Sequence, residues 1–242
     1  MIGARRGIGG PGGIEPLLIF GLIFLAYGFI SGTLVSPVQN AGRDPIGFVA
    51  WLIALVLGIT VHEFMHAYAA HRLGDDTARL LGRLTLNPMA HLDPFGSLLM
   101  VLAGFGYGKP VPFNESRLRS TLGVTFVALA GPLANLALAA LCAIPLRFGG
   151  DSLVGGGVYA EVLFAIVTLN CVLAIFNLIP IPPLDGANVV YGLLSQRMQY
   201  SWRTYQQYGP FLLLGILILA PRLLSTLVFA PANAIARLLL GF

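Results

Sequence analysis

Residues 46–70 read IGFVAWLIALVLGITVHEFMHAYAA, an apolar run whose acid–base side chains near neutral pH are His62, Glu63 and His66. A helix rises about 1.5 Å per residue, so a run of this length crosses the hydrocarbon layer of a bilayer, which is about 30 Å thick. The whole chain suits that environment: 57% of its 242 residues are hydrophobic and 10% are charged, and its mean hydropathy is +0.83. Soluble domains carry roughly 25% charged residues. The sequence therefore predicts a membrane-embedded protein.

Further apolar runs suggest an all-α membrane protein with about six transmembrane helices. The five other expected spans are residues 16–35, 121–146, 158–179, 206–220 and 223–240. The first follows Arg5 and Arg6 as the core of a signal peptide would, but no clear cleavage pattern follows it, so we expect it to be retained. Residues 186–195 are expected to form a short helix. We expect residues 1–242 to be a single domain.

Residues 71–120 differ from the runs on either side because Pro, Gly and charged residues interrupt them. The apolar piece at 95–106 is too short to span a bilayer comfortably. We expect a short β-strand or hairpin and a re-entrant segment between the second and third spans. Non-helical backbone at that depth requires protein or a watery cavity to satisfy its polar groups.

The distribution of the basic residues favours one orientation. With the N-terminus in the cytoplasm and six spans, Arg43, Arg147 and Arg222 would lie outside, and the other eleven Lys and Arg residues, Arg237 among them, would lie inside. That excess is typical of cytoplasmic loops. We accordingly interpret the net charge of +4 as a determinant of topology and expect no nucleic-acid partner.

The second run contains His62-Glu63-Phe64-Met65-His66, an H-E-x-x-H pattern. Positions i and i+4 share a helix face, so both imidazoles can reach one metal ion. Glu63 is turned away by about 100°, close enough to act on a metal-bound water without being a ligand. Ionisable groups are costly inside a bilayer and usually functional. The alternative is that these side chains only hydrogen-bond neighbouring helices.

A catalytic zinc site normally has three protein ligands and a water, and Asp185 is a candidate for the third. The second and fourth apolar runs both cross the membrane from the outside to the cytoplasmic side. His62 lies roughly 24 Å from the outer end of its run, and Asp185 follows the inner end of the fourth, so both lie in the cytoplasmic half of the bilayer. The alternative is that Asp185 caps the next helix, since Asp is a favoured N-cap residue.

These residues resemble the motifs of the site-2 proteases, intramembrane zinc metalloproteases, in a compact form without PDZ or CBS domains. The similarity covers about residues 46–195: HEFMH at 62–66, GPLAN at 131–135, NLIPIPPLDG at 177–186, and GRLTLNPMAHLDP at 82–94, which is similar to a compact subgroup. The resemblance implies one zinc ion per chain, bound by His62, His66 and Asp185. It also implies that Glu63 is the base that activates a zinc-bound water and that Asn177 assists carbonyl or oxyanion binding.

The expected function is that of an intramembrane zinc endopeptidase, which hydrolyses peptide bonds in or near transmembrane segments of membrane-protein substrates. Such a substrate must unwind locally, and residues 84–115 would pair with its extended strand. We expect a multi-pass protein of the cell (plasma or inner) membrane, with its N-terminus and active site toward the cytoplasm.

Two other classes of protein compete with this interpretation. A metal transporter should show several ligand clusters or inverted repeats, and neither is visible in the sequence. An inactive scaffold should have lost Glu63 or a ligand, and all four residues are present.

The sequence leaves the roles of three polar residues open. His91 could support a loop, line the active site or bind a second metal. Asn135 and Asn170 lie in apolar runs, where interhelical hydrogen bonding and an active-site role are both open.

Overall fold

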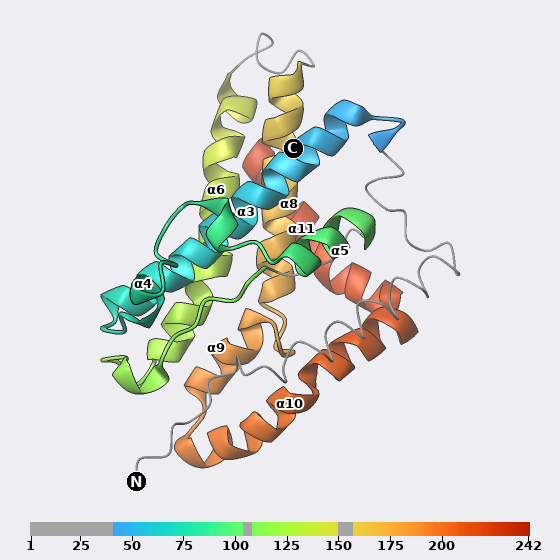
Figure 1. Ribbon diagram of the computed structural model, residues 1–242. Coiled ribbons are helices and arrows are strands. Elements are labelled where there is room, and N and C mark those ends of the chain that lie inside the picture. The colour runs from blue at the N-terminus through green and yellow to red at the C-terminus, as the bar shows by residue number, and fades with distance from the viewer. Residues whose placement is uncertain (1–40, 104–107, 150–156) are drawn as a thin grey trace.

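The computed structural model describes residues 41–103, 108–149 and 157–242, and its regular elements are helices (Figure 1). They are α3 (Pro45–Arg72), α4 (Thr77–Leu80), η1 (Pro88–Ala90), α5 (Pro94–Ala103), η2 (Glu115–Arg117), α6 (Gly123–Phe148), α8 (Val158–Asn177), α9 (Asp185–Leu193), α10 (Gln196–Leu219) and α11 (Pro221–Leu240). The all-α prediction is confirmed for these ranges. The span expected at 16–35 lies outside the described residues.

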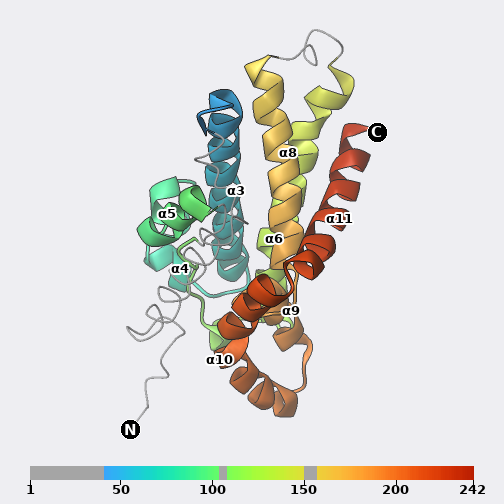
Figure 2. The same cartoon turned by 90° about the vertical axis from the view of Figure 1, so that its right-hand side faces the viewer.

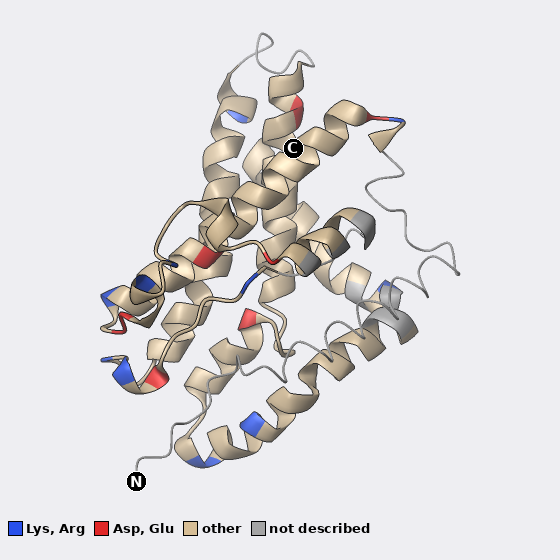
Figure 3. Ribbon diagram, in the orientation of Figure 1, with Lys and Arg blue, Asp and Glu red and all other residues tan. Residues whose placement is uncertain are grey.

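Helices α3, α6 and α8 form the centre of the structure and pack against one another (Figures 1 and 2). Each is long and apolar enough to cross a membrane, and they correspond to the expected spans at 46–70, 121–146 and 158–179. Figure 3 shows Lys, Arg, Asp and Glu mainly toward the ends of this bundle, with uncharged stretches of α6 and α8 between them. The chain is an integral membrane protein.

Helix α11 packs on α6 and α8 through a cluster made mostly of small side chains. Its buried members are Ala139, Ala143, Val167, Cys171, Ala232, Ala236 and Leu240. Small residues let helix backbones approach closely, which is how helices associate in lipid.

The two expected C-terminal spans are arranged differently from the prediction. Helix α10 begins at Gln196, ten residues before the expected start, and its first half lies on α9, where the indole nitrogen of Trp202 donates to the carbonyl of Ala187 at 3.2 Å. Figures 1 and 2 show α11 leading back along the bundle after α10. Within the residues whose side chains the structure describes, α10 and α11 do not count as spans by length and hydropathy, and Ser225–Leu240 of α11 forms a shorter apolar helix.

The placement of Arg237 with Arg72 was wrong. Arg147, at the end of α6, donates to the carbonyl of Leu238 at 2.9 Å, so α11 ends at the Arg147 end of the bundle. The error arose from counting residues 206–220 and 223–240 as two successive spans, which would bring residue 237 back to the Arg72 end. Proline at position 221 lacks the N–H that would continue α10, and the chain bends there without forming an antiparallel pair of spans.

The segment between α3 and α6 was expected to contain a short strand or hairpin and a re-entrant stretch, and its described part contains the helices α4, η1, α5 and η2. Helix α5 lies beside α3 (Figure 2), and Met100 packs against Leu55 and Ile59. In the described part of this segment, β pairing is limited to one isolated antiparallel bridge between Leu92 and Gly108. This bridge places the two ends of residues 93–107 side by side.

The loops at the Arg72 end of the bundle are tied together by one buried carboxylate. Asp75 is fully buried and accepts hydrogen bonds from the backbone and hydroxyl of Thr77, at 3.1 and 2.5 Å. It also accepts one from the backbone of Asn114 at 2.5 Å. These hydrogen bonds connect the segment that follows α3 to the segment that precedes α6.

Candidate metal centre

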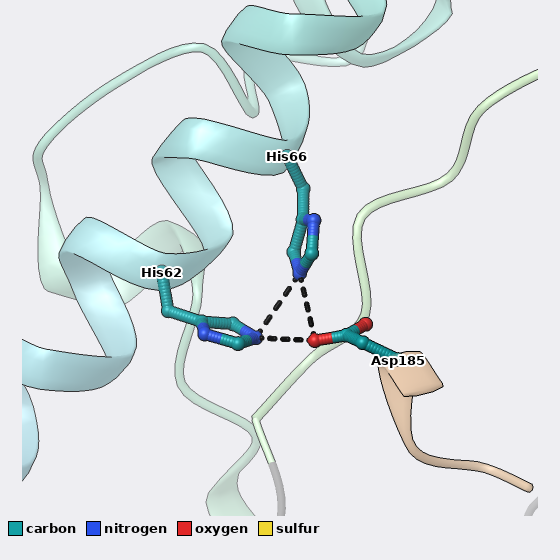
Figure 4. A group of neighbouring side chains, drawn as sticks. All are labelled: His62, His66 and Asp185. Atoms are coloured by element: carbon teal, nitrogen blue, oxygen red, sulfur yellow. Dashed lines mark hydrogen bonds and ion pairs between the residues drawn. The ribbon is translucent and has the colours of Figure 1, made fainter. Parts of the chain in front are cut away.

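His62 and His66 lie one turn apart on α3, and both are buried. Their Nε2 atoms are 3.0 Å apart. Asp185, the first residue of α9, places Oδ2 at 3.0 Å from Nε2 of His62 and 3.2 Å from Nε2 of His66. Figure 4 shows the three side chains pointing toward one another from two elements far apart in the sequence.

The position of Asp185 depends on a close approach of α9 to the end of α8. A Cβ atom on Gly186 would lie 2.2 Å from the carbonyl oxygen of Leu178 and 2.5 Å from that of Ile179. Only glycine fits there without a shift of the backbone. The alternative that Asp185 caps α9 is contradicted, because Leu184 is the N-cap residue and no side-chain capping bond is made.

The other ring nitrogens determine which histidine atoms face the carboxylate. Nδ1 of His66 lies 2.7 Å from the carbonyl oxygen of Val127, and a carbonyl only accepts, so this Nδ1 carries the proton. Nδ1 of His62 lies 2.6 Å from Oδ1 of Asn135, an acceptor as well. In the neutral rings both Nε2 atoms therefore present lone pairs toward the buried Asp185 Oδ2, which receives no hydrogen bond from the described residues. Three acceptors that converge in this way call for a cation.

The cluster has the composition and size of a zinc site. Ligand atoms about 2.0–2.1 Å from zinc at tetrahedral angles lie about 3.3 Å from one another, close to the separations of 3.0–3.2 Å found here. Gly131 on α6 leaves space beside both rings: a Cβ atom there would lie 2.4 Å from Nε2 of His66 and 2.7 Å from Cε1 of His62. Two imidazoles, one carboxylate and this space fit the metal.

Glu63 faces the loop before α6. Its Oε2 accepts a hydrogen bond from the backbone of Val111 at 3.1 Å, and a Cβ atom on Gly108 would come within 3.6 Å of its Oε1. Arg83 is buried and donates from Nη2 to the carbonyl of Lys109. Glu63 thus follows His62 directly in the sequence, and its carboxylate accepts a hydrogen bond from the loop of residues 108–111.

Asn177 is the last residue of α8, and its Nδ2 donates to the carbonyl of Leu173 in the same helix at 2.9 Å. Its role in carbonyl binding stays a prediction. His91 is fully buried, and its Nε2 lies 2.7 Å from the carbonyl oxygen of Thr85. That contact favours the loop-supporting alternative for His91, which lies outside the described group able to hold a metal.

The sequence did not reveal what Asn135, Val127 and Gly131 do at this site. All three lie on one helix, α6, and two of them belong to the GPLAN stretch that the sequence analysis singled out. Their contacts with α3 are tertiary, so no spacing within the chain could have indicated them.

Comparison with known proteins places the chain in a family. Peptidase family M50 matches residues 50–152 and 150–219. The chain belongs to this family. Its sequence is 38% identical over 184 residues to the "Putative zinc metalloprotease YwhC" of Bacillus subtilis, which covers 73% of this chain and 84% of that protein. It is 33% identical over 203 residues to the "Putative zinc metalloprotease Rip2" of Mycobacterium tuberculosis, covering 82% of this chain and 76% of that protein.

A more distant similarity, 26% identity over 158 residues, relates the M50 chain to the "Zinc metalloprotease MJ0392" of Methanocaldococcus jannaschii, with 65% of this chain and 38% of that protein covered. No solved structure matches. The resemblance to the site-2 proteases and the prediction of a zinc metalloprotease are confirmed by the family match and these relatives. The convergence of His62, His66 and Asp185 agrees with zinc as the cofactor.

Proposed function

We propose that this M50 peptidase hydrolyses peptide bonds in or near transmembrane segments of membrane-protein substrates. The observation that carries the proposal is the position of two converging histidines on α3, a helix long and apolar enough to span a bilayer. In this proposal His62, His66 and Asp185 bind one zinc ion per chain. Glu63 is the catalytic base, and Asn177 assists binding of the substrate carbonyl or its oxyanion.

The charges of the two ends support an active site on the cytoplasmic side. His62 lies about 15 Å from Arg72 along the axis of α3. Arg72 and the loop residues near it, namely Arg79, Arg83, Lys109, Arg117 and Arg119, give this end of the bundle a basic excess over the end of Arg43 and Arg147. Basic loops stay in the cytoplasm. We infer a multi-pass protein of the cell membrane with this end inside, and a single domain over residues 1–242.

The apolar piece at 95–106, whose last three residues lie outside the described ranges, is proposed to be re-entrant. The residues that flank it meet at the bridge between Leu92 and Gly108, and Met100 of α5 packs at the level of Leu55 and Ile59, within the apolar half of α3. The segment would thus enter and leave on one side of the bilayer. An extended substrate would pair with the edge of residues 108–111, which lie beside Glu63.

The chemistry follows from the atoms around the site. Bound zinc supplies a Lewis acid that polarises the scissile carbonyl and acidifies water. Glu63 takes the proton of the attacking water and passes it to the leaving amine. The backbone N–H of Val111 orients the Glu63 carboxylate. An amide nitrogen carries two donor hydrogens, and in Asn177 one bonds to Leu173 while the other would donate to the developing oxyanion.

The competing classes have less support. A transport path would need successive ligand clusters, whereas in the described ranges one group, His62, His66 and Asp185, could hold a metal. An inactive scaffold would have no need to preserve a base beside that group.

Cleavage by protein reconstituted in liposomes tests the proposal. A co-reconstituted substrate with one transmembrane helix should be cut in or next to its apolar segment, as mapped by mass spectrometry. Glu63→Gln should lower the rate by at least about 100-fold. The control Glu161→Gln, at the opposite end of the bundle on α8, should not. Full activity of Glu63→Gln, or cuts confined to distant soluble parts, would contradict the proposal.

A further inference from the structure

Two asparagines are fully buried in the centre of the bundle, Asn135 on α6 and Asn170 on α8. A buried amide costs free energy unless its donors and acceptor are paired. The hydrogen bonds of these two amides connect α8 through α6 to a residue of the metal centre.

The directions of these hydrogen bonds can be assigned one after another. Nδ2 of Asn170 lies 2.9 Å from the carbonyl oxygen of Ile166, which only accepts, so this end of the amide is the nitrogen. Its Oδ1 then accepts from Nδ2 of Asn135 at 2.7 Å.

The second amide is oriented by the first. Nδ2 of Asn135 also donates to the carbonyl of Gly58 at 3.1 Å, so both of its N–H groups are used. Its Oδ1 is left facing Nδ1 of His62 at 2.6 Å. Reversing this amide would place a carbonyl-type oxygen against two other acceptors, Oδ1 of Asn170 and the oxygen of Gly58.

We propose that Asn135 and Asn170 are positioning residues that fix the tautomer and the ring orientation of His62. Asn135 holds the proton on Nδ1, so that Nε2 turns its lone pair toward Asp185 and His66. Asn170 holds Asn135 in the orientation this requires. The inference rests on the proposed role of His62 as a zinc ligand. Hydrogen-bonded partners of metal-binding histidines typically act in this way.

A neutral amide suits this task inside a membrane. The usual partner of a ligand histidine is a carboxylate, a backbone carbonyl or water. A second carboxylate would add charge to a site in the apolar part of the bundle, where charge is costly. The amide accepts the hydrogen bond without adding charge.

The approach of α3 to α8 is part of the same arrangement. A Cβ atom on Gly58 would lie 2.8 Å from Oδ1 of Asn170, so the amide pair needs glycine at this place. Gly58 lies one turn before His62 on α3. The backbone that carries the histidine is therefore held by the amide that orients its ring.

Zinc affinity separates this inference from a merely structural role. We would measure the zinc dissociation constant of the full-length protein in detergent by chelator competition, together with the thermal midpoint of the zinc-free form. Asn135→Leu should raise the dissociation constant about 10- to 100-fold. Asn170→Leu should raise it by less, because it acts through Asn135. The control Thr168→Val removes a hydroxyl that bonds within α8, to the carbonyl of Phe164, and should leave zinc affinity unchanged.

The tautomer provides a second readout that helix packing alone would not move. In 15N spectra of histidine-labelled, zinc-free protein, His62 should be protonated at Nδ1 in the wild type, and Asn170→Leu should shift it toward a mixture of tautomers. If Asn135→Leu does not fold, Asn170→Leu decides the question by both measurements. Wild-type zinc affinity and an unchanged tautomer in a folded variant would overturn the inference and leave the peptidase proposal standing. A wild-type protein that binds no zinc would overturn both.

Discussion

A Cβ atom on Gly131 would lie 2.4 Å from Nε2 of His66, against the imidazole rings of the metal centre. Helix α6 therefore contributes to this centre by having no side chain at the point where it faces the imidazoles. The site is built from side chains of α3 and α9, and Gly131 of α6 borders it.

Gly131→Ala should weaken zinc binding while the helices remain folded. Overpacking a filled site costs about 1–3 kcal/mol, so affinity should fall by roughly 10- to 100-fold. Zinc content after dialysis against a weak chelator measures the effect. Gly215→Ala is the matched control, because a Cβ atom at Gly215 of α10 would meet nothing within 4 Å. Equal zinc content in both variants would argue against a metal at this position.

Gly186→Ala should displace Asp185. The added Cβ atom would meet backbone oxygens of Leu178 and Ile179, which cannot move aside as a side chain would. We expect zinc content and peptidase activity to fall together, by about tenfold or more. Gly157→Ala, at a position where a Cβ atom would also meet nothing, should retain both. If Gly186→Ala keeps its zinc, Asp185 is not a ligand.

Arg83→Met should lower activity without releasing zinc. Arg83 donates to the carbonyl of Lys109, and this loop provides the Val111 N–H that holds Glu63. Burial lowers the pKa of the Arg83 guanidinium, and the nearby Glu63 carboxylate opposes that shift. Loosening the loop should reduce the turnover rate by roughly tenfold, as misplaced catalytic groups do.

The control for this variant lies in the same segment, between α3 and α6. Arg79→Met changes an exposed arginine whose partner is Asp76, and its turnover should stay within about twofold of the wild type, since exposed ion pairs contribute little. A similar loss of turnover in both variants would show that removal of a positive charge, and not loss of the contact with Lys109, lowers the rate.

Tyr191→Phe should lower stability slightly and leave zinc content unchanged. The Tyr191 hydroxyl donates to Glu115 at 3.0 Å and accepts from Nε of Arg203 at 3.0 Å, which joins η2, α9 and α10. Tyr191 is buried, but its partners Glu115 and Arg203 are exposed to water, so the loss should be about 0.5–1 kcal/mol. The thermal midpoint of the zinc-bound protein measures it. A fall in zinc content would mean that this contact also positions Asp185.

The parts of the site that could be predicted from sequence are those set by local spacing or helix direction. His62 and His66 follow from the i, i+4 geometry of one helix. Asp185 followed from two apolar runs that go the same way across the membrane. The contact of Asn135 with His62 was not predictable, because it depends on how α6 packs on α3.

The errors in the fold have a similar origin. Apolar runs suggested two C-terminal spans, but the polar first half of α10 packs on α9, and α11 ends beside Arg147. The apolar piece in the segment expected to hold a strand and a re-entrant stretch forms α5 (Pro94–Ala103), whose Met100 packs against Leu55 and Ile59 of α3. Tertiary contacts decided both cases.

The most direct test of the account is the zinc content of the purified protein and of two variants, measured by mass spectrometry of the metal. The account predicts about one zinc ion per chain in the wild type and in Glu63→Gln, and far less in Asp185→Ala. A folded wild-type protein without zinc, or an Asp185→Ala variant that binds zinc as tightly as the wild type, would contradict it.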